Sequence, residues 1–161
     1  MTTSAQTAMA QWERIEALVQ EWLRERQQLL YLISSIRTAS QRTHSSTQVT
    51  GRIQELCELL MDYISAGYFE IYRELAREAR CFQRENQSFT RSIMQRLEDS
   101  TDEALAFNDD FDTEEHIATL IPVLPTRLSD LLEKLEERFS LEDQLIVSIH
   151  QKDEPRRQLV H

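Results

Sequence analysis

The chain has 161 residues, of which 40% are hydrophobic and 29% charged, and its formal net charge is −10. These values suit one globular domain with a core of its own, and the acidity disfavours direct binding to nucleic acid or to an anionic membrane, because both attract basic surfaces. With two glycines and three prolines, the chain has few breaks, which favours an all-α fold over a many-stranded sandwich.

The amino-terminal segment, residues 1–16, lacks the basic and apolar regions of a signal peptide. No apolar run in the sequence approaches the roughly 20 residues of a membrane span. The expected location is therefore the cytoplasm, where Cys57 and Cys81 stay reduced. Cys57 adjoins the apolar stripe of the second expected helix, so we expect it in the core.

A first helix is predicted over about residues 5–36, because apolar side chains recur there at alternating steps of four and three. This stripe, the seam of the helix, consists of Trp12, Ile15, Val19, Trp22, Arg26, Leu29, Ile33 and Ile36. Residues 37–51 are polar and rich in Ser and Thr, and they predict a long loop.

A second helix is predicted over about residues 52–80. Its seam consists of Ile53, Leu56, Leu60, Ile64, Gly67, Ile71 and Leu75. A second face carries Asp62, Ser65, Phe69 and Tyr72. The helix is thus apolar on nearly all sides, whereas a surface helix has one apolar stripe. Such a helix is either enclosed or meets a partner.

A third helix is predicted over about residues 88–109, with Ser100 and Thr101 interrupting its apolar period. The stretch 98–115 holds nine acidic residues and neither Lys nor Arg. A run of this kind is typical of a solvated face, and the sequence leaves open whether it also touches a partner.

A short helix is predicted over 113–121, with Asp112 as its N-cap and Pro122 at its end. Pro125 stands where a helix favours proline, and a fourth helix is predicted over about 126–152. Its seam consists of Leu128, Leu131, Leu132, Leu135, Phe139, Glu142, Ile146 and Ile149.

Four long helices with one seam each predict an up-down four-helix bundle with one additional short helix. The bundle is expected to form a single domain over residues 1–152, followed by a frayed tail, 153–161.

The second face of the second helix has two interpretations. In the first, the short helix 113–121 covers it. In the second, it is a docking face, in which aromatic rings give contact area and Asp62 selects a basic group.

Two charged residues of opposite sign, Arg26 and Glu142, interrupt the seams of the first and fourth helices. Either both lie near bundle ends and extend to water, or they pair inside the bundle, where such a pair fixes which helices face each other. We predict the pairing, with Arg26 in contact with Glu142 or Asp143.

Catalytic and metal-binding motifs are absent from the sequence. Its two glycines are too far apart for a phosphate-binding loop, and there is no GxSxG or HExxH motif. The four histidines do not form the paired ExxH motifs of a di-iron bundle. We therefore expect neither an enzyme nor a bound cofactor or metal.

Four segments together resemble the Rsd/AlgQ family of anti-sigma factors. They are WLRERQQLL (22–30), DYISAGYFEIY (62–72), ALAFND (104–109) and ERFSLEDQLI (137–146). The resemblance spans nearly the whole chain, and the second and fourth segments are the most specific.

The resemblance implies a helical bundle that binds region 4 of the housekeeping, sigma-70 class, sigma factor. That region contains a basic helix-turn-helix that reads the −35 element and docks on core RNA polymerase. A bound anti-sigma factor keeps the sigma factor off both, which in stationary phase frees polymerase for alternative sigma factors.

The motifs imply a set of partner-binding positions, to which Tyr72 is added from its place on the second face. They are Trp22, Arg26, Asp62, Ser65, Phe69, Tyr72 and Glu142. Trp22 and Arg26 have the alternative role of shaping the bundle wall that presents the others. Tyr68 replaces a histidine of the family pattern, which argues against a role for imidazole chemistry there.

A different function stays open beside this one: a helical interaction module for another cytoplasmic regulator that links nutrient state to transcription. The sequence gives neither the affinity nor the signal that controls release. It also leaves open whether so aromatic a surface self-associates when no partner is present.

Overall fold

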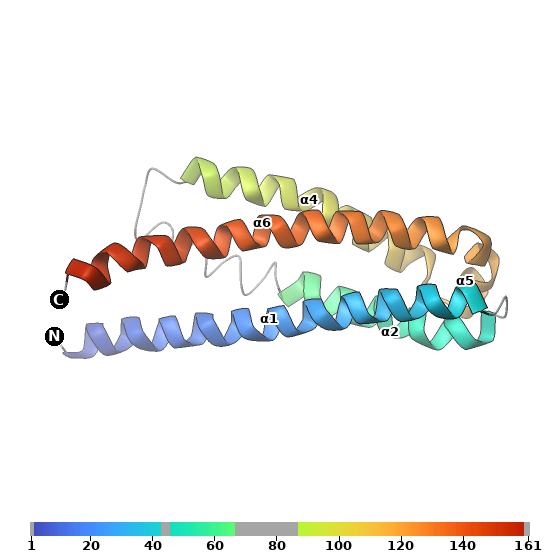
Figure 1. Ribbon diagram of the computed structural model, residues 1–161, viewed down its shortest axis with the longest axis horizontal. Helices are drawn as coiled ribbons and strands as arrows, with labels where there is room; N and C mark the ends of the chain where they lie inside the picture. Colours follow the sequence, from blue (N-terminus) through green and yellow to red (C-terminus); the bar gives the residue numbers. More distant parts are fainter. Residues whose placement is uncertain (1, 43–45, 67–86, 160–161) are drawn as a thin grey trace.

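Four long helices make up most of the part of the chain that the structure describes, and each runs opposite to the one before it, as Figure 1 shows. This computed structural model describes the backbone of residues 2–42, 46–66 and 87–159. The helices are α1 (Thr2–Arg42), α2 (Ser46–Ala66), α4 (Gln87–Asp110) and α6 (Leu124–Leu159). The predicted all-α, up-down bundle is confirmed.

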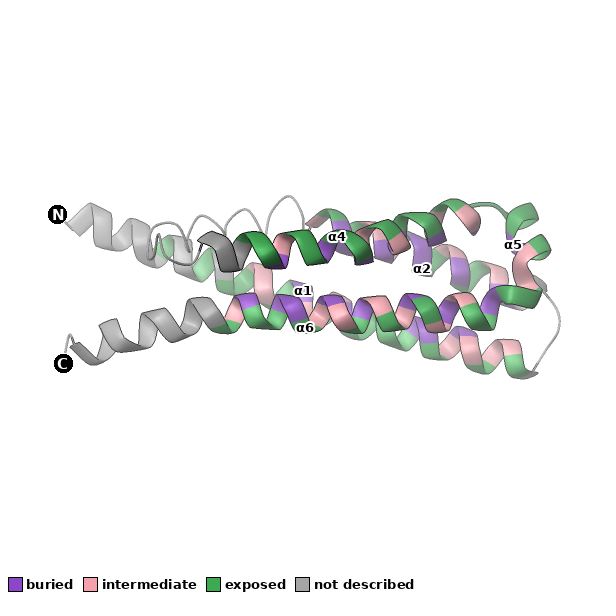
Figure 2. Ribbon diagram, turned by 90° about the horizontal axis from the view of Figure 1, so that it is seen from above, coloured by how far each residue is buried: buried purple, intermediate pink, exposed green. Residues whose placement is uncertain are grey.

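Each long helix packs against two neighbours, in the cyclic order α1, α2, α4, α6. The buried residues face one another along the bundle axis, while exposed residues cover the outside (Figure 2). The core includes Leu97 and Phe107 of α4 and the predicted seam residues Leu29, Ile33, Ile53, Leu60, Leu128 and Leu135. Cys57 is buried among them as expected, and burial raises the pKa of its thiol to about 12.

The predicted loop at residues 37–51 is wrong for most of its length, because α1 continues to Arg42 and α2 begins at Ser46. The hydroxyls of Thr38 and Ser40 donate to backbone carbonyls of the preceding turn instead of ending the helix. Packing also extends both helices: Arg37 Nη2 donates to Ser129 Oγ on α6 at 2.7 Å, and Val49 is buried. Residues 43–45 lie outside the described residues.

The second helix was predicted to reach residue 80. The structure describes it as far as Ala66. The remainder of the prediction, including Phe69 and Tyr72, lies outside the described residues, as do Tyr68 and Cys81.

The third and short helices are confirmed, with one correction at the cap. The N-cap of α5 (Glu114–Leu120) is Thr113, not Asp112, because Thr113 Oγ1 accepts from the His116 backbone N–H at 3.1 Å. Asp112 instead contacts the ring of His116, with 2.8 Å between Oδ1 and Nδ1.

A 3-10 turn, η3 (Ile121–Val123), contains Pro122 and joins α5 to α6. Pro125 lies in the first turn of α6, as predicted, and α6 extends beyond the expected end at residue 152 to Leu159. Residues 153–159 are thus helical, whereas the division into one domain and a tail stays a prediction.

Candidate functional site

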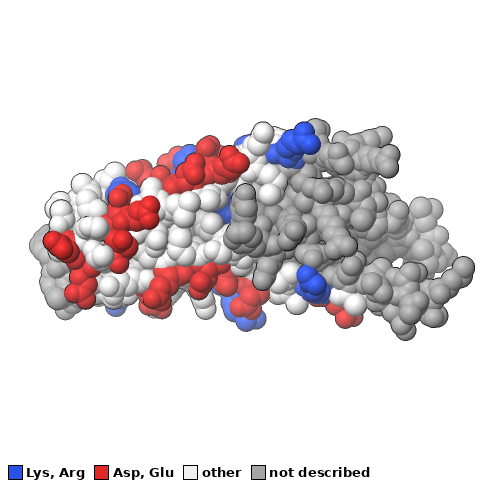
Figure 3. Space-filling view, turned by 180° about the vertical axis from the view of Figure 1, so that it is seen from behind, with Lys and Arg blue, Asp and Glu red and all other residues white. Residues whose placement is uncertain are grey.

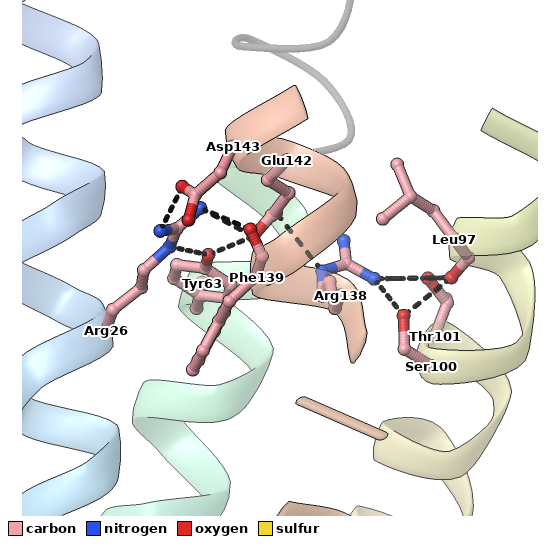
Figure 4. Close-up of polar contacts among 9 residues, drawn as sticks. All are labelled: Arg26, Tyr63, Leu97, Ser100, Thr101, Arg138, Phe139, Glu142 and Asp143. Carbon is pink, nitrogen blue, oxygen red and sulfur yellow. Dashed lines mark hydrogen bonds and ion pairs between the residues drawn. The ribbon is translucent and has the colours of Figure 1, made fainter. Parts of the chain in front are cut away.

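The seam charges of α1 and α6 meet inside the bundle. Arg26 Nη1 lies 2.7 Å from Asp143 Oδ1, and Arg26 Nη2 lies 3.2 Å from Glu142 Oε1 (Figure 4). The predicted contact between Arg26 and Glu142 or Asp143 is confirmed, and Arg26 contacts both. Arg26 is 8% exposed and Glu142 fully buried, so neither extends from a bundle end to water.

Tyr63 of α2 completes this contact from a third helix. Arg26 Nε donates to the Tyr63 hydroxyl at 3.1 Å, and that hydroxyl donates to Glu142 Oε1 at 2.5 Å. Burial and the neighbouring Glu142 carboxylate raise the pKa of Tyr63, despite the opposing charge of Arg26. The side chain is therefore a neutral phenol that accepts one hydrogen bond and donates another.

The pKa of Arg26 is raised as well. Burial by itself lowers it, but the influence of Tyr63, the hydrogen bonds to Asp143 and Tyr63, and the charge of Glu142 outweigh that effect. Arg26 is therefore charged at neutral pH.

Arg138 of α6 extends the cluster to α4. Its Nε lies 3.4 Å from Glu142 Oε2, and its Nη1 donates to Ser100 Oγ and Thr101 Oγ1, each at 2.9 Å (Figure 4). Arg138 is fully buried, a position at which arginine is rare unless it is paired. We call Arg26, Tyr63, Arg138, Glu142 and Asp143 the polar network.

The sequence analysis did not identify Arg138 or Tyr63 as members of this cluster. For Arg138, the sequence does contain a signal. Ser100 and Thr101 break the apolar seam of α4, and Arg138 precedes Glu142 by one helical turn. A polar break on one helix together with a charge one turn from Glu142 indicates a buried contact between α4 and α6.

Aromatic rings enclose the Arg26 guanidinium. Its Cζ lies 5.2 Å from the ring centroid of Trp22 and 4.9 Å from that of Phe139. Trp22 also stacks on Tyr63, with 5.5 Å between ring centroids. The rings shield the guanidinium of this arginine, which is 8% exposed, and cation–π contacts stabilise its charge.

The polar network joins all four long helices across the bundle centre. A buried ion pair adds little net stability, but it fixes how its helices face one another, since removing one partner leaves a buried charge. Tyr63 in particular fixes the rotation of α2 about its axis, because its ring points inward and its hydroxyl has two partners.

Asp62 and Ser65 are exposed on the outer side of α2. The short helix α5 packs against α2 but leaves both residues exposed, so it does not cover this part of the second face. Asp62 directly precedes Tyr63, and the contacts of Tyr63 inside the bundle place Asp62 on the outer side of α2.

The seven predicted partner-binding residues thus fall into different environments. Asp62 and Ser65 are exposed, whereas Trp22, Arg26 and Glu142 are buried in or beside the polar network. Phe69 and Tyr72 lie outside the described residues. In this conformation the three buried residues lie inside the bundle, where each contacts Tyr63 of α2. Their roles in partner binding stay predictions.

Among the described residues, no group of three or more His, Cys, Asp or Glu side chains is arranged to hold a metal ion. No helix in the described ranges is long and apolar enough to cross a membrane.

The sequence of the chain matches a family model described as "Regulator of RNA polymerase sigma(70) subunit, Rsd/AlgQ" over residues 1–150. The chain belongs to the Rsd/AlgQ family. As a member of the Rsd/AlgQ family it is an anti-sigma factor that regulates the sigma-70 subunit of RNA polymerase. The resemblance seen in the four sequence segments is confirmed.

Curated relatives in the Rsd/AlgQ family are called "Regulator of sigma D". The protein of Yersinia pseudotuberculosis (strain YPIII) is 29% identical over 130 residues, covering 80% of this chain and 77% of its own length. That of Pectobacterium carotovorum (strain PC1) is 29% identical over 138 residues, covering 81% and 86%. No solved structure matches the chain.

Proposed function

We propose that this anti-sigma factor binds region 4 of the housekeeping sigma factor and so blocks its association with core RNA polymerase and with the −35 element. The observation that carries the proposal is the exposed Asp62 and Ser65 face of α2, held in place by the polar network in a chain of this family. The protein acts by binding and not as an enzyme, in the cytoplasm, where the polymerase is.

Charge complementarity supports region 4 as the bound part. A helix-turn-helix positions itself on DNA through Arg and Lys contacts to phosphates. The chain carries a net charge of −10, and Figure 3 shows that Asp and Glu cover more of the described part of one face than Lys and Arg. An acidic bundle competes with DNA for the same basic side chains.

The family match favours this function over an interaction module for a different regulator. Self-association of the protein in the absence of sigma factor is a separate question. It is tested by measuring whether the molecular mass in solution rises with protein concentration. The surface that self-associates would then be the one that region 4 covers, so excess region 4 fragment should dissociate the oligomer.

Co-purification at low salt tests the proposal. Three baits are compared: the full-length housekeeping sigma factor, its region 4 fragment, and the sigma factor without region 4. We expect the first two to retain the protein and the third to lose it. Retention by the sigma factor that lacks region 4 would contradict the proposed binding region, and retention by none would contradict direct binding.

A further inference from the structure

A groove of about 580 Å³ runs between α1 and α2 on the outside of the bundle. Leu32 and Leu59 line it and are largely buried, while Tyr31 beside them is 72% exposed. A large aromatic side chain left in water next to apolar side chains is typical of a surface that binds another protein.

Three carboxylates line the α2 side of the groove. Glu55, Glu58 and Asp62 are all exposed and follow one another at steps of three and four residues, so they form a row along one side of the helix. Arg52 is the one basic residue among the described lining residues, and its Nη1 donates to the Ser35 carbonyl at 3.3 Å. The groove is therefore acidic along its length, with one positive charge at the Arg52 end.

Asp62, at one end of the groove, repels a carboxylate that lies outside the described lining. Burial, and then the charges of Glu21 and Asp62, raise the pKa of Glu25. A cation placed beside Asp62 relieves that repulsion, and bound basic side chains supply such a cation.

The length of the groove along α2 matches a short stretch of helix. From Arg52 to Asp62 the rise of α2 is about 15 Å at about 1.5 Å per residue, which equals nearly three turns. Basic residues repeating at steps of three and four on a partner helix match the row of carboxylates, and an apolar residue beside them meets Leu32, Leu59 and Tyr31.

We infer that the α1–α2 groove receives one helix of region 4, a helix that carries Arg and Lys along the side facing Glu55, Glu58 and Asp62. This inference rests on the proposed function, because it takes region 4 as the occupant. Tyr31 supplies contact area on the α1 side, and Arg52 opposes the basic helix at one end of the groove.

Two charge reversals with the same effect on net charge separate docking in the groove from general electrostatic attraction. Glu58→Lys changes the groove, and Glu133→Lys changes an exposed position on α6, which does not line it. The affinity of each full-length variant for the purified region 4 fragment is measured by titration calorimetry at moderate salt. We expect a loss of about tenfold or more for Glu58→Lys and of less than about threefold for Glu133→Lys.

Two milder variants test the same groove without charge reversal. Tyr31→Ala is expected to weaken binding by about tenfold, as for an aromatic contact in an interface, and Arg52→Gln to tighten it by about two- to threefold, because a repulsive charge is removed. All four positions are exposed, so circular dichroism and the thermal midpoint should match those of the unmodified chain.

The outcomes are distinct. Equal losses for the two charge reversals, or unchanged affinity in Glu58→Lys, would overturn docking in the groove while region 4 binding stands. No binding of the unmodified chain to the fragment at low salt would overturn the proposed function and, with it, the occupant of the groove.

Discussion

Arg26 donates from Nε to the hydroxyl of Tyr63 at 3.1 Å, and the same hydroxyl donates to Glu142. One side chain of α2 is thereby tied to α1 and to α6. Because Tyr63 follows Asp62 directly, this buried contact places Asp62 on the outer side of α2. Tyr63 in the interior of the bundle and Asp62 on the surface that we assign to the partner are thus neighbours in the sequence.

Tyr63→Phe should lower the free energy of unfolding by about 1–3 kcal/mol, because a buried guanidinium and a buried carboxylate each lose a hydrogen-bond partner. Urea denaturation at pH 7 measures the change. The control is Tyr31→Phe, which removes the same atom from a side chain that is 72% exposed and should change stability by less than about 0.5 kcal/mol. Equal effects of the two substitutions would show that the Tyr63 hydroxyl has no special role.

Arg26→Met and Glu142→Gln should each destabilise the fold by up to about 3–5 kcal/mol, because each removes an ion-pair partner from a buried charge. In the first variant Glu142 keeps Arg138 as an ion-pair partner, and in the second Arg26 keeps Asp143. The double variant should lose less than the sum of the two, by an interaction energy of about 0.5–3 kcal/mol. Arg24→Met serves as the control: it breaks an exposed ion pair with Glu21 and should cost less than about 1 kcal/mol. Strict additivity would contradict direct coupling between Arg26 and Glu142.

The helices and most of the core could be predicted from the spacing of apolar residues, because residues that recur along one side of a long helix are the ones that the bundle buries. The Arg26 contact was predictable because two opposite charges interrupt two seams. The extension of α1 and α2 through the Ser- and Thr-rich stretch was not, because Val49 and the Arg37–Ser129 hydrogen bond override local propensity. Arg138 was missed because an arginine on a charged helix looks exposed until its contacts across the bundle are known.

Glu25→Gln should stabilise the protein at pH 7. The folded state raises the pKa of Glu25 through burial and the charges of Glu21 and Asp62, so ionisation of this group opposes folding. The protonated Glu25 carboxyl contributes to the free energy of unfolding when the pH is below its pKa in the unfolded chain, about 4.3. This contribution is lost as the pH rises through the higher pKa of Glu25 in the folded chain. The charge of Glu21, one turn away on α1, costs about 0.2–0.5 kcal/mol, and the relief of burying a charge adds to the gain.

Thermal midpoints of Glu25→Gln and of the unmodified chain between pH 4 and pH 8 measure this effect. The variant should be the more stable at pH 7, and the difference should shrink towards pH 4. Glu13→Gln, at an exposed position of the same helix, is the matched control. A constant difference across the range would contradict the assignment to Glu25 ionisation.

Asp62→Ala should weaken binding to region 4 by about tenfold, or about 1.4 kcal/mol, while the free energy of unfolding changes by less than about 0.5 kcal/mol, because the side chain is exposed. Fluorescence anisotropy with a labelled region 4 fragment gives the affinity. Asp130→Ala removes an equally exposed carboxylate from α6 and should leave the affinity nearly unchanged. If both variants bind as the unmodified chain does, Asp62 lies outside the docking face.

The central claim is that this protein and core RNA polymerase compete for one region of the sigma factor. The most direct measurement is the amount of sigma factor bound to immobilised core polymerase as the protein is added. We expect bound sigma factor to fall to near zero, with a midpoint that follows the directly measured affinity and shifts about tenfold in Asp62→Ala. A stable ternary complex of core polymerase, sigma factor and this protein, at concentrations that saturate region 4, would contradict the claim.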